Sequence, residues 1–266
     1  MIMDMTYAGE TLSSYGFMIG GIGTSNSANE IETDSQRTFN SVSLFYGAYQ
    51  PFVFSQYENR LEMDFDIILD PCKANNPETL TQAKIRAVKK WLNRPSAHKL
   101  TFDKEGFENV FWEGSFNVQE TYFGGTPISL HLHFVSNRPF GLYEERTYGG
   151  RLGAEDYFVV NDISDDEGHI YPSFEVTCGA DGELVIYNDL DRRSTVIKNC
   201  TQGETIVFTP TMQVRSSLSS HDLGRDFNYI FTRINNTYDN TVNRIFTSLP
   251  IDFTLKYNPI AKAVIA

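Results

Sequence analysis

A mostly β protein of two units is predicted from the sequence: a β-sandwich or split barrel with one flanking α-helix, then a second β-sandwich. Three features of the sequence lead to this prediction. Only residues 77–93 show the apolar spacing of an amphipathic helix. Short runs in which apolar and polar residues alternate fill most of the remaining chain. The chain also contains 20 Phe and 14 Tyr among its 266 residues, and aromatic residues favour sheets.

The predicted helix of residues 77–93 has signals at both ends. Asn76 is a residue type that caps helices, and Pro95 marks the end. Strand-like runs at residues 61–69 and 98–102 flank the helix, so we expect it to cover a sheet. The stripe that we expect to face this sheet consists of Leu80, Ala83, Ala87, Val88, Trp91 and Leu92.

The first unit, residues 1–140, is predicted to consist of antiparallel strands around this helix. A hairpin is predicted over residues 7–19, and a meander with one buried face over residues 37–69. The first apolar positions of the meander are Phe39, Val42, Leu44 and Tyr46. Further strands are predicted at residues 99–102, 110–118 and 128–135.

Residues 141–168 are interpreted as a linker, because they are rich in glycine and charge and only residues 157–160 look like a strand. The second unit, residues 169–266, contains at least six strand-like runs at short spacing. Among them, residues 172–178 and 183–187 are joined around an Asp-Gly step, which is a good hairpin signal. This series predicts a second β-sandwich.

Composition argues against several classes of protein. With 22 Lys and Arg against 34 Asp and Glu, the formal charge of −12 would repel nucleic-acid phosphates. No apolar run approaches the ~18 residues of a membrane-spanning helix, and the N-terminus lacks the apolar segment of a signal peptide. Cys72, Cys178 and Cys200 form no Cys-x-x-Cys pair, so we expect buried thiols in a reducing cytoplasm.

Candidate metal ligands occur in two places. His131 and His133 lie two residues apart, which places both on one face of a strand and is a spacing that metal sites use. The apolar residues of that strand fall on its other face, so we expect a solvated or interface face instead. The second group is acidic: Asp162, Asp165, Asp166 and Glu167. It misses the spacing of a calcium loop, and a solvated linker is expected.

No catalytic motif is recognisable in the sequence. His221-Asp222 and Arg225-Asp226 are charged pairs in a serine-rich loop, with no partner that the sequence assigns. Signatures of serine hydrolases, kinases and metalloproteases are missing. We therefore expect no catalytic residues, no metal ligands and no cofactor.

A series of short motifs runs through the whole chain. In the first unit they are Thr6-Tyr-Ala-Gly9, Tyr15-Gly16, the strand of residues 60–71, Ser136-Asn-Arg-Pro139 and Tyr143. In the second unit they are Asn161, Asp166-Glu-Gly168, Tyr171-Pro172, Tyr187-Asn188, Gly203-Glu204, Asn243-Arg-Ile245 and Tyr257-Asn-Pro259. In order and spacing, this series resembles the distal tail proteins of long-tailed bacteriophages.

The resemblance implies a structural protein of the virion tail tip, made in the cytoplasm of the bacterial host. It implies an N-terminal β-sandwich similar to tail-tube proteins, which forms a homo-hexameric ring, and a galectin-like C-terminal β-sandwich. The implied partners are the tail-tube protein, the tail-tip hub protein, and receptor-binding or fibre proteins mounted on the ring. It implies no catalytic residues. From the charge and the lack of a long apolar run, we expect no sequence-specific nucleic-acid binding and no membrane insertion. Phage DNA would pass through the ring, where an acidic lining would repel its phosphates.

Two other functions stay open from the sequence. A carbohydrate-binding module that assists host adsorption would present aromatic residues such as Tyr187 or Tyr229 to a sugar. A glycosidase or other hydrolase would need a cleft with paired carboxylates, and the sequence does not identify such a pair.

Overall fold

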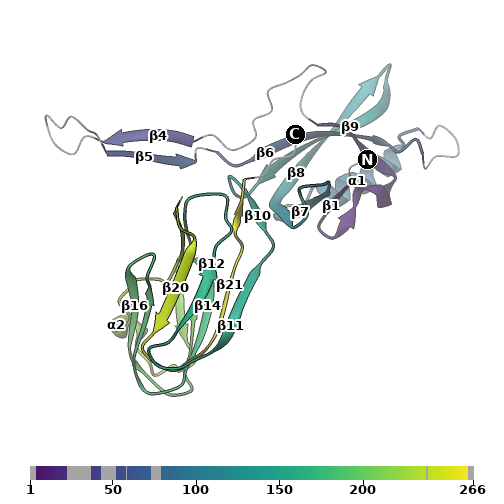
Figure 1. The fold of residues 1–266 in the computed structure, drawn as a ribbon. Coiled ribbons are helices and arrows are strands. Elements are labelled where there is room, and N and C mark those ends of the chain that lie inside the picture. Colours follow the sequence, from purple (N-terminus) through teal and green to yellow (C-terminus); the bar gives the residue numbers. More distant parts are fainter. Residues whose placement is uncertain are drawn as a thin grey trace. The chain divides into compact units, whose positions relative to one another are not determined.

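The structure is a computed structural model of the chain (Figure 1). It describes residues 4–22, 37–42, 52–57, 59–72, 79–237 and 239–262. The chain forms two compact units, one of Met1–Leu142 with Ala261–Ala266 and the other of Tyr143–Ile260. The chain therefore enters the second unit once and returns to the first at its end. The predicted mostly β fold is confirmed, since strands predominate among the described residues.

The first unit is built on a nine-stranded sheet, with seven strands on its main path in the order β2-β1-β7-β8-β9-β6-β3. These strands are β1 (Asp4–Tyr7), β2 (Glu10–Thr11), β3 (Phe17–Ile22), β6 (Glu62–Leu69), β7 (His98–Asp103), β8 (Val110–Phe123) and β9 (Thr126–Ser136). The short strands β10 (Gly141–Tyr143) and β22 (Ile260–Ala261) complete the sheet. A 3-10 turn, η1 (Leu12–Tyr15), connects β2 to β3.

Alternation along β6 shows why this sheet has one buried face. Met63, Phe65 and Ile67 are buried, and the acidic residues between them are partly exposed. Since successive side chains of a strand point to opposite faces, the period of two places all three apolar groups in the core.

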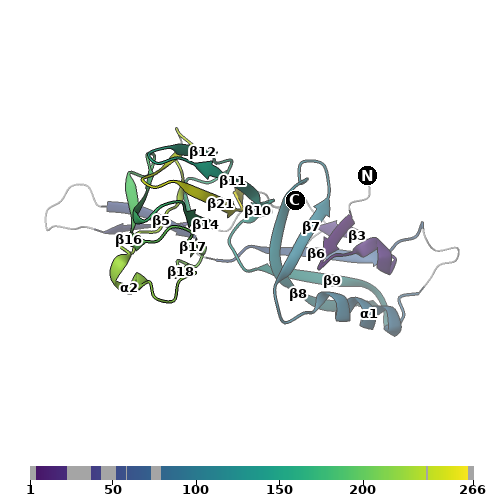
Figure 2. The same ribbon diagram turned by 90° about the horizontal axis from the view of Figure 1, so that it is seen from below.

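Helix α1 (Gln82–Leu92) packs against β8, as the sequence predicted for a helix covering a sheet (Figure 2). Trp91 fixes its last turn in the core. The indole Nε1 of Trp91 donates a hydrogen bond to the Tyr7 carbonyl at 2.9 Å, and the Tyr15 ring stacks on the indole with 4.6 Å between ring centroids. These contacts join the helix to β1 and η1.

The predicted start of the helix at residue 77 is wrong. Residues 79–81 are not helical, and Thr81 caps the first turn by accepting a hydrogen bond from the Lys84 backbone at 3.4 Å. Leu80 and Ile85 then occupy the two positions of a hydrophobic staple, and both are buried. Asn76 and Pro77 lie outside the described residues.

The buried stripe of α1 also differs from the predicted one. It consists of Ile85, Val88, Trp91 and Leu92. Ala83 and Ala87, which were predicted to belong to the stripe, are exposed. An alanine methyl group buries little area, so the larger residues decide which side of the helix faces the sheet.

The predicted meander over residues 37–69 is only partly confirmed. β6 has the expected buried face, but β4 (Arg37–Val42) and β5 (Phe52–Tyr57) form a separate two-stranded sheet. In β4, Phe39 is 74% exposed and Val42 is also exposed. A period of two shows which residues share a face, but not whether anything covers that face. Leu44 and Tyr46 lie outside the described residues.

The second unit is a β-sandwich, as predicted. One sheet has the order β11-β21-β14-β17-β18 and the other β12-β20-β15-β16. The strands of the first are β11 (Arg146–Leu152), β14 (Ser173–Cys178), β17 (Thr205–Phe208), β18 (Val214–Ser216) and β21 (Ile251–Tyr257). Those of the second are β12 (Tyr157–Asn161), β15 (Gly182–Asn188), β16 (Arg193–Cys200) and β20 (Val242–Thr247). A short pair, β13 (Gly168–Ile170) with β19 (Ile234–Asn236), and a helical turn, α2 (Leu223–Asp226), complete the unit.

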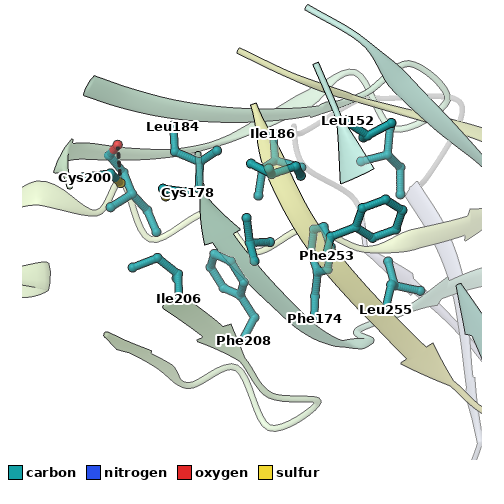
Figure 3. Close-up of a cluster of buried hydrophobic side chains, with 14 of the residues drawn as sticks. Leu152, Phe174, Cys178, Leu184, Ile186, Cys200, Ile206, Phe208, Phe253 and Leu255 are labelled. Carbon is teal, nitrogen blue, oxygen red and sulfur yellow. Dashed lines mark hydrogen bonds between the residues drawn. The ribbon is translucent and has the colours of Figure 1, made fainter. Parts of the chain in front are cut away.

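Both sheets contribute to one hydrophobic core, which Figure 3 shows. The five-stranded sheet supplies Phe174, Val176, Ile206 and Leu255, among others, and the four-stranded sheet supplies Val160, Leu184, Ile186 and Ile245. These residues occur at alternate positions of their strands, the pattern expected for two sheets that face each other.

The segment interpreted as a linker, residues 141–168, instead carries strands of the sandwich. Its strand β11 pairs along its whole length with β21, and β12 pairs with β20. Gly149 and Gly150 lie in the middle of β11, where glycine weakens the strand signal in the sequence. The pairing with β21, about a hundred residues later in the chain, supplies the order that local propensity does not.

Candidate interaction surfaces

His131 and His133 lie on β9 opposite two acidic residues of β6. In the pairing of β6 with β9, His131 lies opposite Asp66 and His133 lies opposite Asp64. His131 Nδ1 is 3.0 Å from Asp66 Oδ1, and His133 Nδ1 is 2.9 Å from Asp64 Oδ1. Both histidines are half-buried, and they point away from the fully buried Leu132 of the same strand. Among the residues that the structure describes, no group of three or more His, Cys, Asp or Glu could hold a metal ion.

The acidic group expected to be solvated is partly built into the second unit. Asp162 is buried and accepts hydrogen bonds from Ser164 Oγ and Asn236 Nδ2, both at 3.0 Å. Asp165 accepts one from the Tyr143 hydroxyl at 2.9 Å. Asp166 is buried as well. The expectation of a solvated group is therefore wrong for Asp162 and Asp166, which are buried, whereas Asp165 and Glu167 are exposed as expected.

His221 has partners that the sequence did not reveal. Its Nδ1 lies 2.5 Å from Glu204 Oε1, and its Nε2 lies 2.9 Å from the Lys198 carbonyl oxygen. Glu204 also accepts hydrogen bonds from the Thr201 backbone, at 2.9 Å, and from the Ser216 hydroxyl. The side chains of His221 and Glu204 are both buried. Sequence reasoning missed this cluster, since it is assembled from β16, the turn between β16 and β17, β18 and the loop before α2.

Charge in this cluster follows from its hydrogen bonds. Burial opposes ionisation of Glu204, but the hydrogen bonds from Ser216 and His221 outweigh it and lower the pKa of this carboxyl group. Burial likewise opposes the charge on His221, but Glu204 raises the pKa of its imidazole. A carbonyl oxygen only accepts hydrogen bonds, so Nε2 must carry a proton. Nδ1 donates to the Glu204 carboxylate, so both nitrogens carry protons and the imidazole is positively charged. The cluster is therefore an ion pair that fastens the loop before α2.

An aromatic row crosses the outer face of the four-stranded sheet. It consists of Tyr157, Phe246 and Tyr187, which are adjacent in register. The ring centroids of Tyr157 and Phe246 lie 4.9 Å apart, and those of Tyr187 and Phe246 lie 6.3 Å apart. Tyr157 is 45% exposed. Arg244 lies on β20 two residues before Phe246, and its Nη1 donates a hydrogen bond to Asp189 Oδ2 at 3.2 Å. The row thus combines apolar ring surface with neighbouring charged groups.

The other tyrosine considered for sugar binding, Tyr229, is not part of this row. It is 67% exposed, and its hydroxyl donates a hydrogen bond to the Gly224 carbonyl of α2 at 2.8 Å.

In the first unit, the end of the β8–β9 hairpin carries exposed apolar side chains. We call Tyr122, Phe123 and Ile128 the hairpin tip; all three are exposed, Phe123 by 77%. The turn between the strands, Gly124 and Gly125, has φ angles of 57° and 82°, which favour glycine. The tip lies beyond the residues of β9 that pair with β6, which begin at Leu130.

Paired carboxylates occur at one depression of the surface, which bears on a hydrolytic function. Glu175 and Asp252 both line a depression of about 180 Å³ on the five-stranded sheet. Arg151 donates hydrogen bonds to Asp252 at 2.7 and 2.8 Å, and this pairing lowers the pKa of the Asp252 carboxyl group. A glycosidase needs a general acid of raised pKa in such a pair. Asp252 does not meet that requirement.

Comparison with known families covers both units. A model of a phage tail protein N-terminal domain matches residues 1–138, and a model of a phage tail C-terminal domain matches residues 140–257. The chain belongs to a family of phage tail proteins. No curated protein matches its sequence. Among its described residues, no helix is long and apolar enough to cross a membrane.

This phage tail protein is also similar to a solved structure, the Dit protein (gp 19.1) of SPP1. That protein is described as a paradigm of the hub adsorption apparatus in phages that infect Gram-positive bacteria. The match has a TM-score of 0.66 at 13% identity and covers 97% of this chain and 99% of the other. The predicted resemblance to distal tail proteins is thus confirmed, and at this identity it is a likeness of fold.

Proposed function

We propose that this phage tail protein is a structural hub of the tail tip. It forms a hexameric ring that joins the tail tube to the tail-tip hub, and receptor-binding or fibre proteins are mounted on it. It is made in the cytoplasm of the bacterial host and has no catalytic role. The observation that supports this most is the match of fold, over nearly the full length of both chains, to the SPP1 hub protein.

Exposed apolar groups of the first unit support self-association. Phe39 and Val42 of the two-stranded sheet and the hairpin tip present large apolar side chains to water in the single chain. Burial of apolar area stabilises a contact by roughly 25 cal/mol per Å². Neighbouring copies that cover these groups would gain this free energy. In the single chain the same groups stay in contact with water.

Light scattering on the purified full-length chain tests the ring. The expected mass is six times the chain mass of 30.2 kDa. Phe39→Ser and Phe123→Ser should lower the hexamer fraction. Tyr229→Ser changes an aromatic residue of the second unit that is also largely exposed, and it should leave the fraction unchanged. A monomer at high concentration, both alone and mixed with the tail-tube protein, would contradict the proposal.

The acidic charge is consistent with DNA passing through such a ring. A net charge of −12 disfavours binding to phosphates, so the ring would guide DNA without holding it. In an experimental structure of the assembly, we expect acidic side chains to line the passage; a basic lining would contradict this role.

A second candidate function, a carbohydrate-binding module that assists host adsorption, is favoured by the aromatic row. Exposed rings can stack on the apolar faces of sugars, and the Arg244–Asp189 pair could bind hydroxyl groups. A glycan array with the full chain tests this. If the row binds sugar, Tyr157→Ala should abolish saccharide binding and Tyr229→Ala should not. No binding by the unmodified chain would remove this candidate.

A further inference from the structure

Two buried cysteines lie at one end of the sandwich core. Cys178 is the last residue of β14 in the five-stranded sheet, and Cys200 is the last residue of β16 in the four-stranded sheet. Figure 3 shows both at the same end of the core cluster. Their exposed fractions are 1% and 2%, and both are free thiols.

The turn after Cys200 brings the two cysteines together. The Cys178 backbone N–H donates to the Glu204 carbonyl at 2.8 Å, and the Gly203 N–H donates to the Cys178 carbonyl at 2.7 Å. Residues 201–204 therefore fold back onto Cys178 directly after Cys200. The side chains are neighbours as well, since both belong to the same buried cluster and the Cys200 thiol lowers the pKa of the Cys178 thiol. Two thiols from opposite sheets thus lie together at one end of a buried apolar core.

We propose that Cys178 and Cys200 form an intramolecular disulfide between the two sheets when the protein meets a small disulfide oxidant such as oxidised glutathione. One cysteine thiolate attacks the S–S bond of the oxidant, forms a mixed disulfide and releases one glutathione. The second cysteine attacks the mixed disulfide and releases the other glutathione. The two thiol protons pass to the two released thiolates, so one oxidised glutathione yields two reduced molecules and one protein disulfide.

The hydrogen bond of the Cys200 thiol assigns the order of attack. Its Sγ donates to the Ile197 carbonyl at 3.5 Å, which keeps the proton on Cys200. The neighbouring Cys200 thiol lowers the pKa of the Cys178 thiol, whereas Cys178 and burial raise the pKa of Cys200. Because the thiolate is the nucleophile, Cys178 attacks first during transient opening of the core. Cys72 is different, since it is exposed and belongs to the first unit.

Such a bond would distinguish two states of the protein. In a reducing cytoplasm the pair stays a dithiol, because thiol buffers keep cysteines reduced there. In an oxidising medium the pair closes and links the two sheets covalently across residues 178–200. A cross-link over a loop of this length restricts the unfolded chain and so raises the stability of the folded sandwich. This inference does not depend on the hexameric ring.

Thiol labelling of the full-length Cys72→Ser variant tests the proposal. The protein is equilibrated in glutathione buffers of graded redox ratio, in urea just below its unfolding transition so that the core opens. Thiol exchange is then quenched with acid, the protein is unfolded and alkylated, and mass spectrometry counts the alkyl labels. We expect two alkyl labels in the reducing buffers. In the oxidising buffers we expect none, and a mass lower by two hydrogens. The thermal midpoint should rise by roughly 5–10 °C on oxidation and fall again after reduction.

Matched variants complete the design. Cys178→Ala and Cys200→Ala, each made with Cys72→Ser, should show no rise in the midpoint on oxidation. Two free thiols, or two glutathione adducts, in the most oxidising buffer would overturn the proposal. A disulfide that lowers the thermal midpoint would overturn the stabilising role. Should either alanine variant fail to fold, the label count on the Cys72→Ser protein still decides the outcome.

Discussion

His221 and Glu204 form a buried charge pair in the second unit, with 2.5 Å between His221 Nδ1 and Glu204 Oε1. Removing one partner of such a pair leaves the other charge buried without compensation. We therefore expect His221→Ala to lower the free energy of unfolding by about 3 kcal/mol, measured by urea denaturation. Arg225→Ala removes an exposed partner of Asp226 and should have a small effect. Equal losses in the two variants would contradict the assignment.

The same pair predicts a pH dependence of stability. The His221 pKa is raised above its ordinary value of 6.5, so its contribution is full below that pH and is lost as pH rises through the folded-state pKa. The Glu204 pKa is lowered below 4.5, so its contribution is full above pH 4.5 and is lost as pH falls through the folded-state pKa. The difference in unfolding free energy between the native chain and His221→Gln should be largest between these two ordinary values. A difference that stays constant from pH 5 to 9 would show that His221 does not titrate as described.

The two tryptophans offer a matched comparison of one hydrogen bond. Both are buried in the first unit. Trp91 Nε1 donates to the Tyr7 carbonyl, whereas Trp112 Nε1 has no hydrogen-bond partner among the described residues. Trp91→Phe removes a hydrogen bond and leaves the Tyr7 carbonyl without this donor, whereas Trp112→Phe removes a donor that makes no hydrogen bond to the described residues. Trp91→Phe should therefore lower the unfolding free energy by about 1–2 kcal/mol more than Trp112→Phe. Guanidinium denaturation of both variants measures this; the reverse order would contradict the packing described for α1.

Gly114 allows the close approach of β8 and β9. A methyl group there would lie 2.3 Å from the Val135 carbonyl oxygen and 2.5 Å from the Phe134 ring. Gly114→Ala should lower the unfolding free energy by about 3 kcal/mol or more, because neither backbone nor packed ring can move away. Gly21→Ala, on β3, meets nothing within 4 Å and serves as the control. Similar thermal midpoints for both variants would contradict the register of the β8–β9 pair.

Apolar periodicity within single elements was enough to predict one buried strand face and the position of the helix. The alternation of Met63, Phe65 and Ile67 predicted the buried face of β6, and the apolar spacing around Trp91 predicted a helix on a sheet. The start of that helix was wrong, because Asn76 and Thr81 are both good caps and sequence alone does not choose between them.

Long-range partners account for what the sequence did not predict. β11 contains two adjacent glycines and is ordered by β21. The His221–Glu204 pair joins residues seventeen positions apart, which no short motif covers. Phe39 alternates like a core residue, yet it is exposed in the single chain. Of the candidate surfaces, sequence reasoning found Tyr187 but neither Tyr157 nor Phe246, because the aromatic row forms only when three strands pair.

Cryo-electron microscopy of tails from the phage that carries this protein tests the hub proposal most directly. We predict a six-fold ring at the tail tip, directly below the tail tube, into which six copies of the nine-stranded unit fit with Phe39 and the hairpin tip covered by neighbouring chains. Finding this protein along the tail shaft, or as a single copy with these apolar groups facing solvent, would contradict the proposal.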